Sequence, residues 1–171
     1  VFRTRSDTEV IVQAWMAWGP ACVHRLRGMF AFAIWDQKQQ TLFMARDRMG
    51  VKPLFYAVLD DGTLLFGSEL KSLLAHGGLR RDIDPQAVEE YFALGYVAEP
   101  RSIFRQARKL APGHMLTIRR GEPVPEPREY WDVRFTLDNP CSAEAACAAL
   151  VQRLRESVKL LQAAGARPCG V

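Results

Sequence analysis

Residues 29–66, MFAFAIWDQKQQTLFMARDRMGVKPLFYAVLDDGTLLF, contain four short apolar segments in two pairs, each pair joined by a polar link. The segments are residues 29–36, 41–45, 54–59 and 63–66. Side chains on a strand alternate between its two faces, and in the first pair both faces are apolar. The link within the second pair ends in Asp61-Gly62, a strong hairpin signal. We therefore predict two antiparallel hairpins, with strand 29–36 covered on both faces.

Helical signals surround the two predicted hairpins. Ser6 and Glu9 form a capping-box pattern, which predicts a helix from Asp7 to the Gly19-Pro20 stop. Further along the chain, Asp84 followed by Pro85 is typical of another helix start. Paired hairpins flanked by helices predict a layered α+β fold.

A change of composition divides the chain near its C-terminal end. Residues 122–140 hold four prolines, which predicts a linker, and Tyr130-Trp131-Asp132 within it offers a packing anchor. Beyond the linker, Ser142 is placed to cap a long helix with an apolar stripe on one side. We predict a domain over residues 1–121, a linker over 122–140 and the start of a second domain over 141–171.

Composition excludes several classes of function. The net charge is +4, but 23 basic residues are scattered among 19 acidic ones, unlike the basic stripe of a nucleic-acid-binding protein. No apolar stretch is long enough to cross a membrane. The spacing of the four cysteines does not fit a zinc site, so no metal site is expected, and each cysteine, Cys22 included, is interpreted as a free core or surface thiol. His76 and His114, next to turn or helix-end signals, are interpreted as structural.

Four ordered motifs resemble the glutamine amidotransferase domain of glutamine-hydrolysing asparagine synthetases. They are Ser6-Asp7-Thr8-Glu9-Val10-Ile11, Arg46-Asp47-Arg48-Met49-Gly50-Val51-Lys52-Pro53-Leu54, Gly67-Ser68-Glu69-Leu70-Lys71-Ser72-Leu73 and Lys109-Leu110-Ala111-Pro112-Gly113-His114. The resemblance implies an α+β fold, the four-layer α-β-β-α sandwich of N-terminal nucleophile hydrolases. It also implies a fragment, because the family's catalytic N-terminal Cys would lie upstream of Val1. No catalytic residue is therefore expected within this sequence, and the family's pyrophosphate-binding loop would lie just beyond Val171.

Asp7 is the substrate-binding candidate. By resemblance, its carboxylate pairs with the α-ammonium of bound glutamine, a task suited to a group that accepts charge-assisted hydrogen bonds. Without the resemblance, Asp7 would be an acidic residue that complements the dipole of the first helical turn.

The residues of the longest motif have two readings. In the structural reading, Gly50 adopts a positive φ, Pro53 directs the chain, and the Arg and Asp residues of the motif pair in a buried turn. In the functional reading, Arg46, Asp47, Arg48 and Lys52 support the glutamine pocket or the route by which ammonia leaves. Both readings stay open on the sequence alone.

The resemblance implies that the parent protein hydrolyses glutamine and uses ATP to amidate aspartate, with Mg²⁺ bound mainly through the ATP phosphates. Its expected partners are these small molecules, without nucleic acid or membrane; a homodimer is compatible with this assignment, and a cytoplasmic location is the default. These residues themselves are expected to bind no cofactor. Three alternatives are amidotransferases for amino sugars or purine precursors, an enzyme that amidates another carboxylate in polysaccharide or antibiotic pathways, and a non-catalytic interaction module with the same fold.

Overall fold

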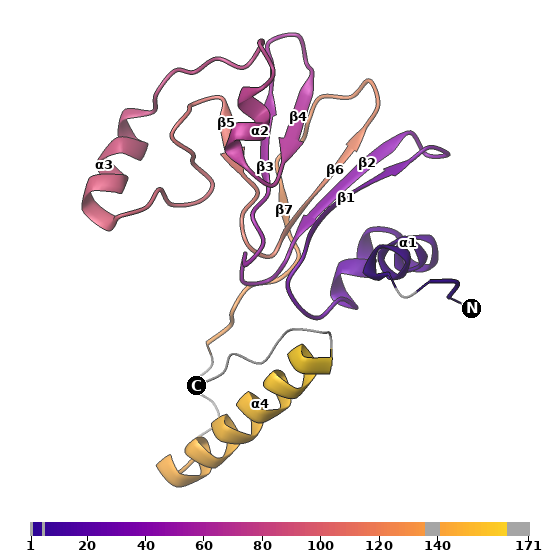
Figure 1. Ribbon diagram of the computed structural model, residues 1–171, viewed down its shortest axis with the longest axis vertical. Coiled ribbons are helices and arrows are strands. Elements are labelled where there is room, and N and C mark those ends of the chain that lie inside the picture. Colours follow the sequence, from indigo (N-terminus) through magenta and orange to yellow (C-terminus); the bar gives the residue numbers. More distant parts are fainter. Residues whose placement is uncertain (1, 5, 136–140, 164–171) are drawn as a thin grey trace. The chain divides into compact units, whose positions relative to one another are not determined.

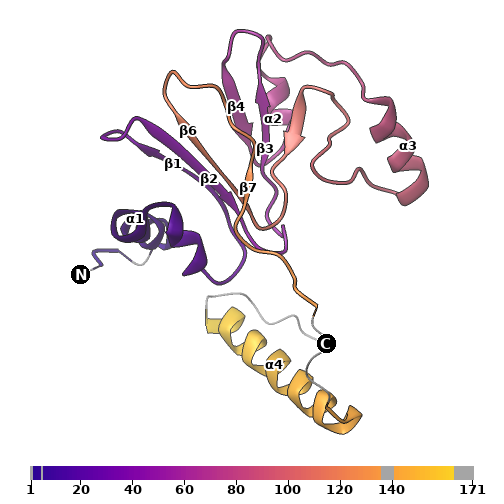
Figure 2. The same ribbon diagram turned by 180° about the vertical axis from the view of Figure 1, so that it is seen from behind.

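The computed structural model describes residues 2–4, 6–135 and 141–163. The chain divides into two compact units, Val1–Asp132 and Val133–Val171, and each is described by itself. The first unit is an α+β structure with two antiparallel sheets and three α-helices (Figures 1 and 2).

The larger sheet of the first unit has the strand order β1-β2-β6-β7, and the smaller sheet has the order β4-β3-β5. The larger sheet comprises β1 (Ala31–Asp36), β2 (Thr41–Arg46), β6 (His114–Arg119) and β7 (Arg128–Glu129). The smaller sheet comprises β3 (Phe55–Val58), β4 (Leu64–Gly67) and β5 (Ala107–Lys109). Both predicted hairpins are confirmed, because β1 pairs with β2 and β3 pairs with β4, each antiparallel.

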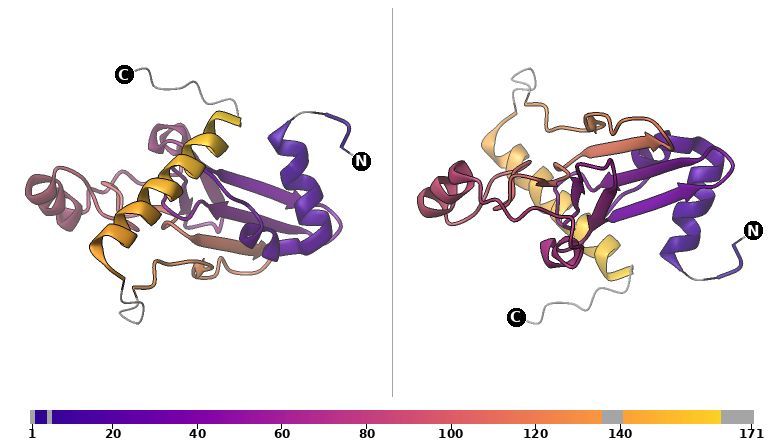
Figure 3. Two further views of the ribbon diagram at one scale, coloured as in Figure 1. Left: turned by 90° about the horizontal axis from the view of Figure 1, so that it is seen from below. Right: turned by 90° about the horizontal axis from the view of Figure 1, so that it is seen from above.

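Three groups of buried side chains hold the first unit together. In the first, Trp15 of α1 (Asp7–Trp18) and Val23 of the following 3-10 helix (Gly19–His24) pack with Phe43 of β2. In the second, Met44 of β2 packs with Tyr56 of β3. In the third, Leu73 of α2 (Leu70–Leu74) packs with residues of β3 and β5. Phe43 and Met44 point to opposite faces of β2, so α1 covers one face of the larger sheet and the smaller sheet packs against the other (Figure 3).

The predicted helix starts are confirmed. The Ser6 hydroxyl accepts a hydrogen bond from the Thr8 N–H at the start of α1. The Asp84 carboxylate accepts one from the Gln86 N–H at the start of α3 (Pro85–Leu94), with Pro85 in the first turn. Each cap satisfies a backbone donor that the helix leaves unpaired.

The expectation that strand 29–36 is covered on both faces is wrong for one of them. Phe32 and Ile34 pack against the buried group around Trp15. On the other side Ala33 is exposed and Trp35 remains 49% exposed. The physical reason is that β1 lies at the edge of its sheet, next to β2 alone.

Part of the predicted linker 122–140 lies within the first unit. β7 pairs with β6, and the backbone N–H groups of Tyr130 and Trp131 both donate to the Gly113 carbonyl, at 2.8 and 3.2 Å. The first unit accordingly extends to Asp132. The division of the parent protein into domains stays a prediction.

Gly113 provides a test of this junction. Its φ is +64°, and an added Cβ would overlap the Trp131 carbonyl. We expect Gly113→Ala to lower the free energy of unfolding by about 2–4 kcal/mol, because backbone strain and a steric clash add. Gly62→Ala is the matched control, since Gly62 has φ +82° but open space around it; it should cost about 1–2 kcal/mol. Urea denaturation of both variants measures the difference, and equal losses would contradict the role of the Trp131 contact.

The second unit contains one helix among its described residues, α4 (Ala143–Ala163). The predicted cap is confirmed, because the Ser142 hydroxyl accepts from the Ala145 N–H at 3.2 Å. The apolar side chains of Leu150, Leu154 and Val158 are exposed. Neither α4 nor any other helix in the described part of the chain is long and apolar enough to cross a membrane. The assignment of α4 to a synthetase domain stays a prediction.

Candidate functional site

A groove of about 610 Å³ runs along β1 at the open edge of the larger sheet. The start of α1 contributes Asp7 and Thr8, β1 contributes a row of apolar side chains, and the loop after β2 contributes Lys52 and Pro53. The full lining is Asp7, Thr8, Ile11, Val12, Met29, Phe30, Ala31, Phe32, Ala33, Ile34, Trp35, Lys52, Pro53 and Ser68. The groove is therefore mainly apolar, with a few polar groups at its margins, as is typical of small-molecule sites.

Asp7 and Lys52 are the two charged residues among those that line the groove. The Asp7 carboxylate lies in the first turn of α1, where its Oδ1 accepts from the Thr8 N–H at 2.8 Å. Lys52 lies in the loop between β2 and β3. One acidic and one basic group in an apolar groove suit a ligand that carries both charges, such as a free amino acid.

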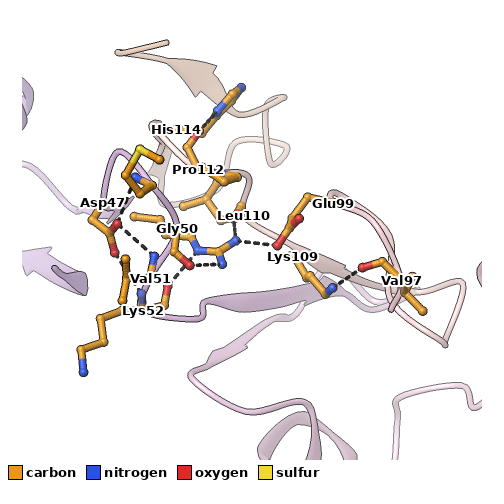
Figure 4. Close-up of polar contacts among 12 residues, drawn as sticks. Asp47, Gly50, Val51, Lys52, Val97, Glu99, Lys109, Leu110, Pro112 and His114 are labelled. Atoms are coloured by element: carbon orange, nitrogen blue, oxygen red, sulfur yellow. Dashed lines mark hydrogen bonds and ion pairs between the residues drawn. The ribbon is translucent and has the colours of Figure 1, made fainter. Parts of the chain in front are cut away.

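Behind the groove, the Asp47 carboxylate is buried and accepts hydrogen bonds from four backbone N–H groups. Figure 4 shows Asp47 with Gly50, Val51 and Lys52 of the turn that follows it. The donors and distances are Met49 at 3.1 Å, Val51 at 3.0 Å, Lys52 at 2.9 Å and Phe30 at 3.3 Å. The turn is closed further by the Gly50 N–H, which donates to the Asp47 carbonyl at 3.1 Å. Asp47 thus fixes the loop that carries Lys52.

The neighbouring Arg46 is also buried, but it does not form the predicted pair with Asp47. Its guanidinium donates to the carbonyls of Lys52, Gly50 and Leu110, at 2.8, 2.7 and 2.7 Å. Its ion-pair partner is Glu99, with Nη1 and Oε1 3.3 Å apart. The prediction of Arg–Asp pairing within the motif is wrong for Arg46, because backbone N–H groups surround the Asp47 carboxylate and carbonyls together with Glu99 surround the Arg46 guanidinium.

The four residues of the motif thus occupy different places. Lys52 lines the groove, whereas Arg46 and Asp47 lie buried behind the loop. Arg48 points elsewhere, with its Nη1 donating to the Leu26 carbonyl at 2.9 Å. The structural reading of the motif therefore describes Arg46 and Asp47, whereas Lys52 lines the groove and its role stays a prediction.

Tyr130 and Glu99 contribute to this region and were not predicted as site residues. The Tyr130 hydroxyl donates to the Arg46 carbonyl at 2.7 Å, and burial raises its pKa to about 12. Tyr130 had a sequence signal as a packing anchor. Glu99 had none, because its partner Arg46 lies 53 residues away in the chain.

The side chains of Cys22, His76 and His114 lie outside the groove lining. Cys22 is fully buried, and burial raises the pKa of its thiol, so little reactive thiolate forms near neutral pH. The Nδ1 atom of His114 lies 2.7 Å from the Pro112 carbonyl oxygen, and the Nδ1 atom of His76 accepts from the Gly78 N–H. His76 thus lies in a turn, and His114 is the first residue of β6, directly after one.

Comparison with known proteins identifies the family. The glutamine amidotransferase domain family matches residues 1–131. Asparagine synthetase [glutamine-hydrolyzing] 3 of Bacillus subtilis is 43% identical over 68% of this chain and 19% of that protein. A putative asparagine synthetase [glutamine-hydrolyzing] of Mycobacterium bovis is 41% identical over 79% of this chain and 21% of that protein. A Penicillium rubens protein named Amidase chyE is 34% identical over 91% of this chain and 23% of that protein.

The chain therefore spans about a fifth of the length of these relatives. The family match covers most of the chain, including the groove with Asp7 and Lys52 and the buried turn behind it. The chain belongs to the glutamine amidotransferase domain family.

Proposed function

We propose that the groove binds glutamine and that Asp7 pairs with the glutamine α-ammonium. The observation that carries the proposal is the pairing of Asp7 with an otherwise apolar groove in a chain of this family. A carboxylate stays ionised near neutral pH and forms charge-assisted hydrogen bonds with an ammonium group. The nucleophile would be an N-terminal Cys thiolate of the parent protein, which attacks the amide carbon and releases ammonia.

The layering supports the N-terminal nucleophile type of fold. α1 packs on one face of the larger sheet, the two sheets pack together, and α2 packs on the smaller sheet. This order supports the proposal of a four-layer α-β-β-α sandwich. In such a sandwich, the groove along β1 would lie where the catalytic N-terminus of the parent protein reaches the substrate.

For the parent protein we propose ATP-dependent amidation of aspartate, with ammonia from this domain as the nitrogen source. ATP, with Mg²⁺, would convert the carboxylate into an acyl adenylate that ammonia attacks. The similarity to glutamine-hydrolysing asparagine synthetases supports aspartate as the acceptor. A cytoplasmic location and a homodimer are further parts of this proposal.

A second proposal is an enzyme of the same design that amidates another carboxylate. The specific observation in its favour is the similarity to the protein named Amidase chyE, which extends over 91% of this chain. The groove lies in the glutaminase part and does not distinguish the two acceptors.

The test uses the full-length parent protein supplied with glutamine, ATP, Mg²⁺ and either aspartate or a panel of other carboxylates. With aspartate as the acceptor, we expect asparagine, glutamate and pyrophosphate to form in equal amounts. The 171-residue chain serves as the control and should release no ammonia, because none of its cysteines carries a free α-amine. Amide formed only from another carboxylate would favour the second proposal. No glutamine hydrolysis by the full-length protein would contradict both and indicate an interaction module.

A further inference from the structure

Glu99 provides the charge that balances a buried cation. The Arg46 side chain is 6% exposed, and within the described part of the chain Glu99 is the acidic residue that forms an ion pair with it. Three backbone carbonyls accept its remaining hydrogen bonds. A buried guanidinium needs both hydrogen-bond acceptors and a compensating charge, because desolvation disfavours an unpaired ion.

The loop over residues 50–52 contacts the Arg46 guanidinium, which donates to the Gly50 and Lys52 carbonyls. A Cβ at Gly50 would come within 3.0 Å of the Arg46 Nη2 atom and 2.7 Å of the Pro112 Cγ atom. The Lys52 carbonyl accepts from Arg46, while the Lys52 N–H donates to Asp47. The backbone at Lys52 is thus held on both sides, and its position depends on the orientation of the guanidinium.

Glu99 is itself held in place by its neighbours. The Lys109 ammonium donates to the Val97 carbonyl, the Ala98 N–H donates to the Glu90 carboxylate at 3.1 Å, and the Lys109 N–H donates to the Pro100 carbonyl at 2.8 Å. These bonds fix the backbone on either side of Glu99. Its carboxylate is therefore presented to Arg46 from an ordered segment.

We propose that Glu99 is a positioning residue for the glutamine groove. Glu99 orients Arg46, Arg46 fixes the loop over residues 50–52, and this loop places Lys52 in the groove wall opposite the start of α1. The inference rests on the proposed glutamine site, since Lys52 and Asp7 line the same groove. Glu99 acts through Arg46 and does not touch the ligand.

Removal of the Glu99 charge should loosen the loop without unfolding the domain. Glu99 is partly exposed, with a side-chain exposure of 32%, so its replacement is tolerated better than that of Arg46. When its partner is neutral, the buried guanidinium is an unpaired charge, and turning toward water lowers its free energy. Its bonds to the Gly50 and Lys52 carbonyls then weaken. Lys52 would then no longer hold one position in the groove wall.

The test has a structural and a functional readout. In the 171-residue chain, Glu99→Gln should speed hydrogen exchange of the Val51 and Lys52 amides roughly tenfold, as expected for a locally weakened segment. In the full-length parent protein, it should raise KM for glutamine roughly three- to tenfold and leave kcat for ammonia-dependent synthesis unchanged. A purely structural role for Glu99 would lower both reactions together or neither.

Asp60→Asn is the matched control, because it removes the charge from a more exposed ion pair, Asp60 with Arg80, that does not involve Arg46. It should change neither readout. Unchanged exchange at Val51 and Lys52 in Glu99→Gln, or faster exchange without a change in KM, would overturn the proposal. If Glu99→Gln fails to fold, Glu99→Asp replaces it, which keeps the charge on a shorter side chain. The same changes in hydrogen exchange and in KM for glutamine are then expected, but they should be smaller.

Asp7→Asn in the same assays separates the two proposals. If Asp7→Asn leaves glutamine use intact, the proposed glutamine site fails, and the exchange data still decide whether Glu99 holds the loop. If Asp7→Asn impairs glutamine use while Glu99→Gln has no effect on either readout, the positioning role alone fails.

Discussion

Replacement of Asp47 by Ala should lower the free energy of unfolding of the 171-residue chain by about 3–5 kcal/mol. The Asp47 carboxylate is buried and accepts from four backbone N–H groups, which would lose their acceptor together. Donors that lose their acceptor in a partly buried turn are costly, and this turn also contacts Arg46. Urea denaturation followed by circular dichroism measures the loss.

The control for Asp47→Ala is Asp82→Ala, which removes an exposed carboxylate whose partner Arg80 lies 3.5 Å away. Exposed ion pairs contribute less than about 1 kcal/mol to stability, so the free energy of unfolding of this variant should be close to that of the unsubstituted 171-residue chain. A loss below about 1 kcal/mol for Asp47→Ala would mean that water replaces the carboxylate and that the turn does not depend on it.

Replacement of Asp7 by Asn in the full-length parent protein should lower kcat/KM for glutamine roughly ten- to hundredfold. The expected cause is the loss of a charge-assisted bond to the glutamine α-ammonium. Synthesis from added ammonia should remain, because that reaction bypasses the groove. Parallel assays with the two nitrogen sources measure the split.

Ser6→Ala is the control for the capping role of this helix start. The Ser6 hydroxyl and the Asp7 carboxylate both accept from the Thr8 N–H, at 3.2 and 2.8 Å, but only Asp7 lines the groove. Ser6→Ala should therefore leave the preference between glutamine and ammonia unchanged. An equal loss with both nitrogen sources in Asp7→Asn would assign Asp7 to the helix cap and reject its role in binding.

The local features of the fold could be predicted from the sequence. The Asp61-Gly62 step predicts the β3–β4 hairpin, and Gly62 has the positive φ, +82°, that such a turn uses. Ser6 and Asp84 predict the helix starts, because a side-chain cap depends on residues two or three positions away. Such signals need no knowledge of the rest of the chain.

The partners of Arg46 could not be predicted in this way. The sequence predicted Arg–Asp pairing within the motif, whereas the structure pairs Arg46 with Glu99 and the Leu110 carbonyl. These contacts arise because the two sheets pack together, and the packing of sheets is not encoded in any short motif. The motif therefore predicted a buried turn, and its partners required the whole fold.

The groove was predicted in part. The sequence pointed to Asp7 and Lys52 separately, by resemblance to a family, but contained no sign that they line the same groove. Apolar residues on both sides of β1 predicted a strand covered on both faces. The structure places β1 at the sheet edge, with Trp35 half exposed beside Asp7 and Lys52 in the groove lining.

The bond from Tyr130 to Arg46 has a consequence for synthesis on the ribosome. The two residues are 84 positions apart, and β2 acquires its partner β6 only when residues 114–119 have emerged. At a translation rate of about 5–20 residues per second, Tyr130 is synthesised roughly 4–17 seconds after Arg46. Met44, fully buried in the finished domain, lacks the cover of Tyr56, Leu110 and Leu116 until those residues emerge. The nascent chain is therefore most exposed to aggregation while residues 47–130 are translated, and slower translation there lengthens that exposure.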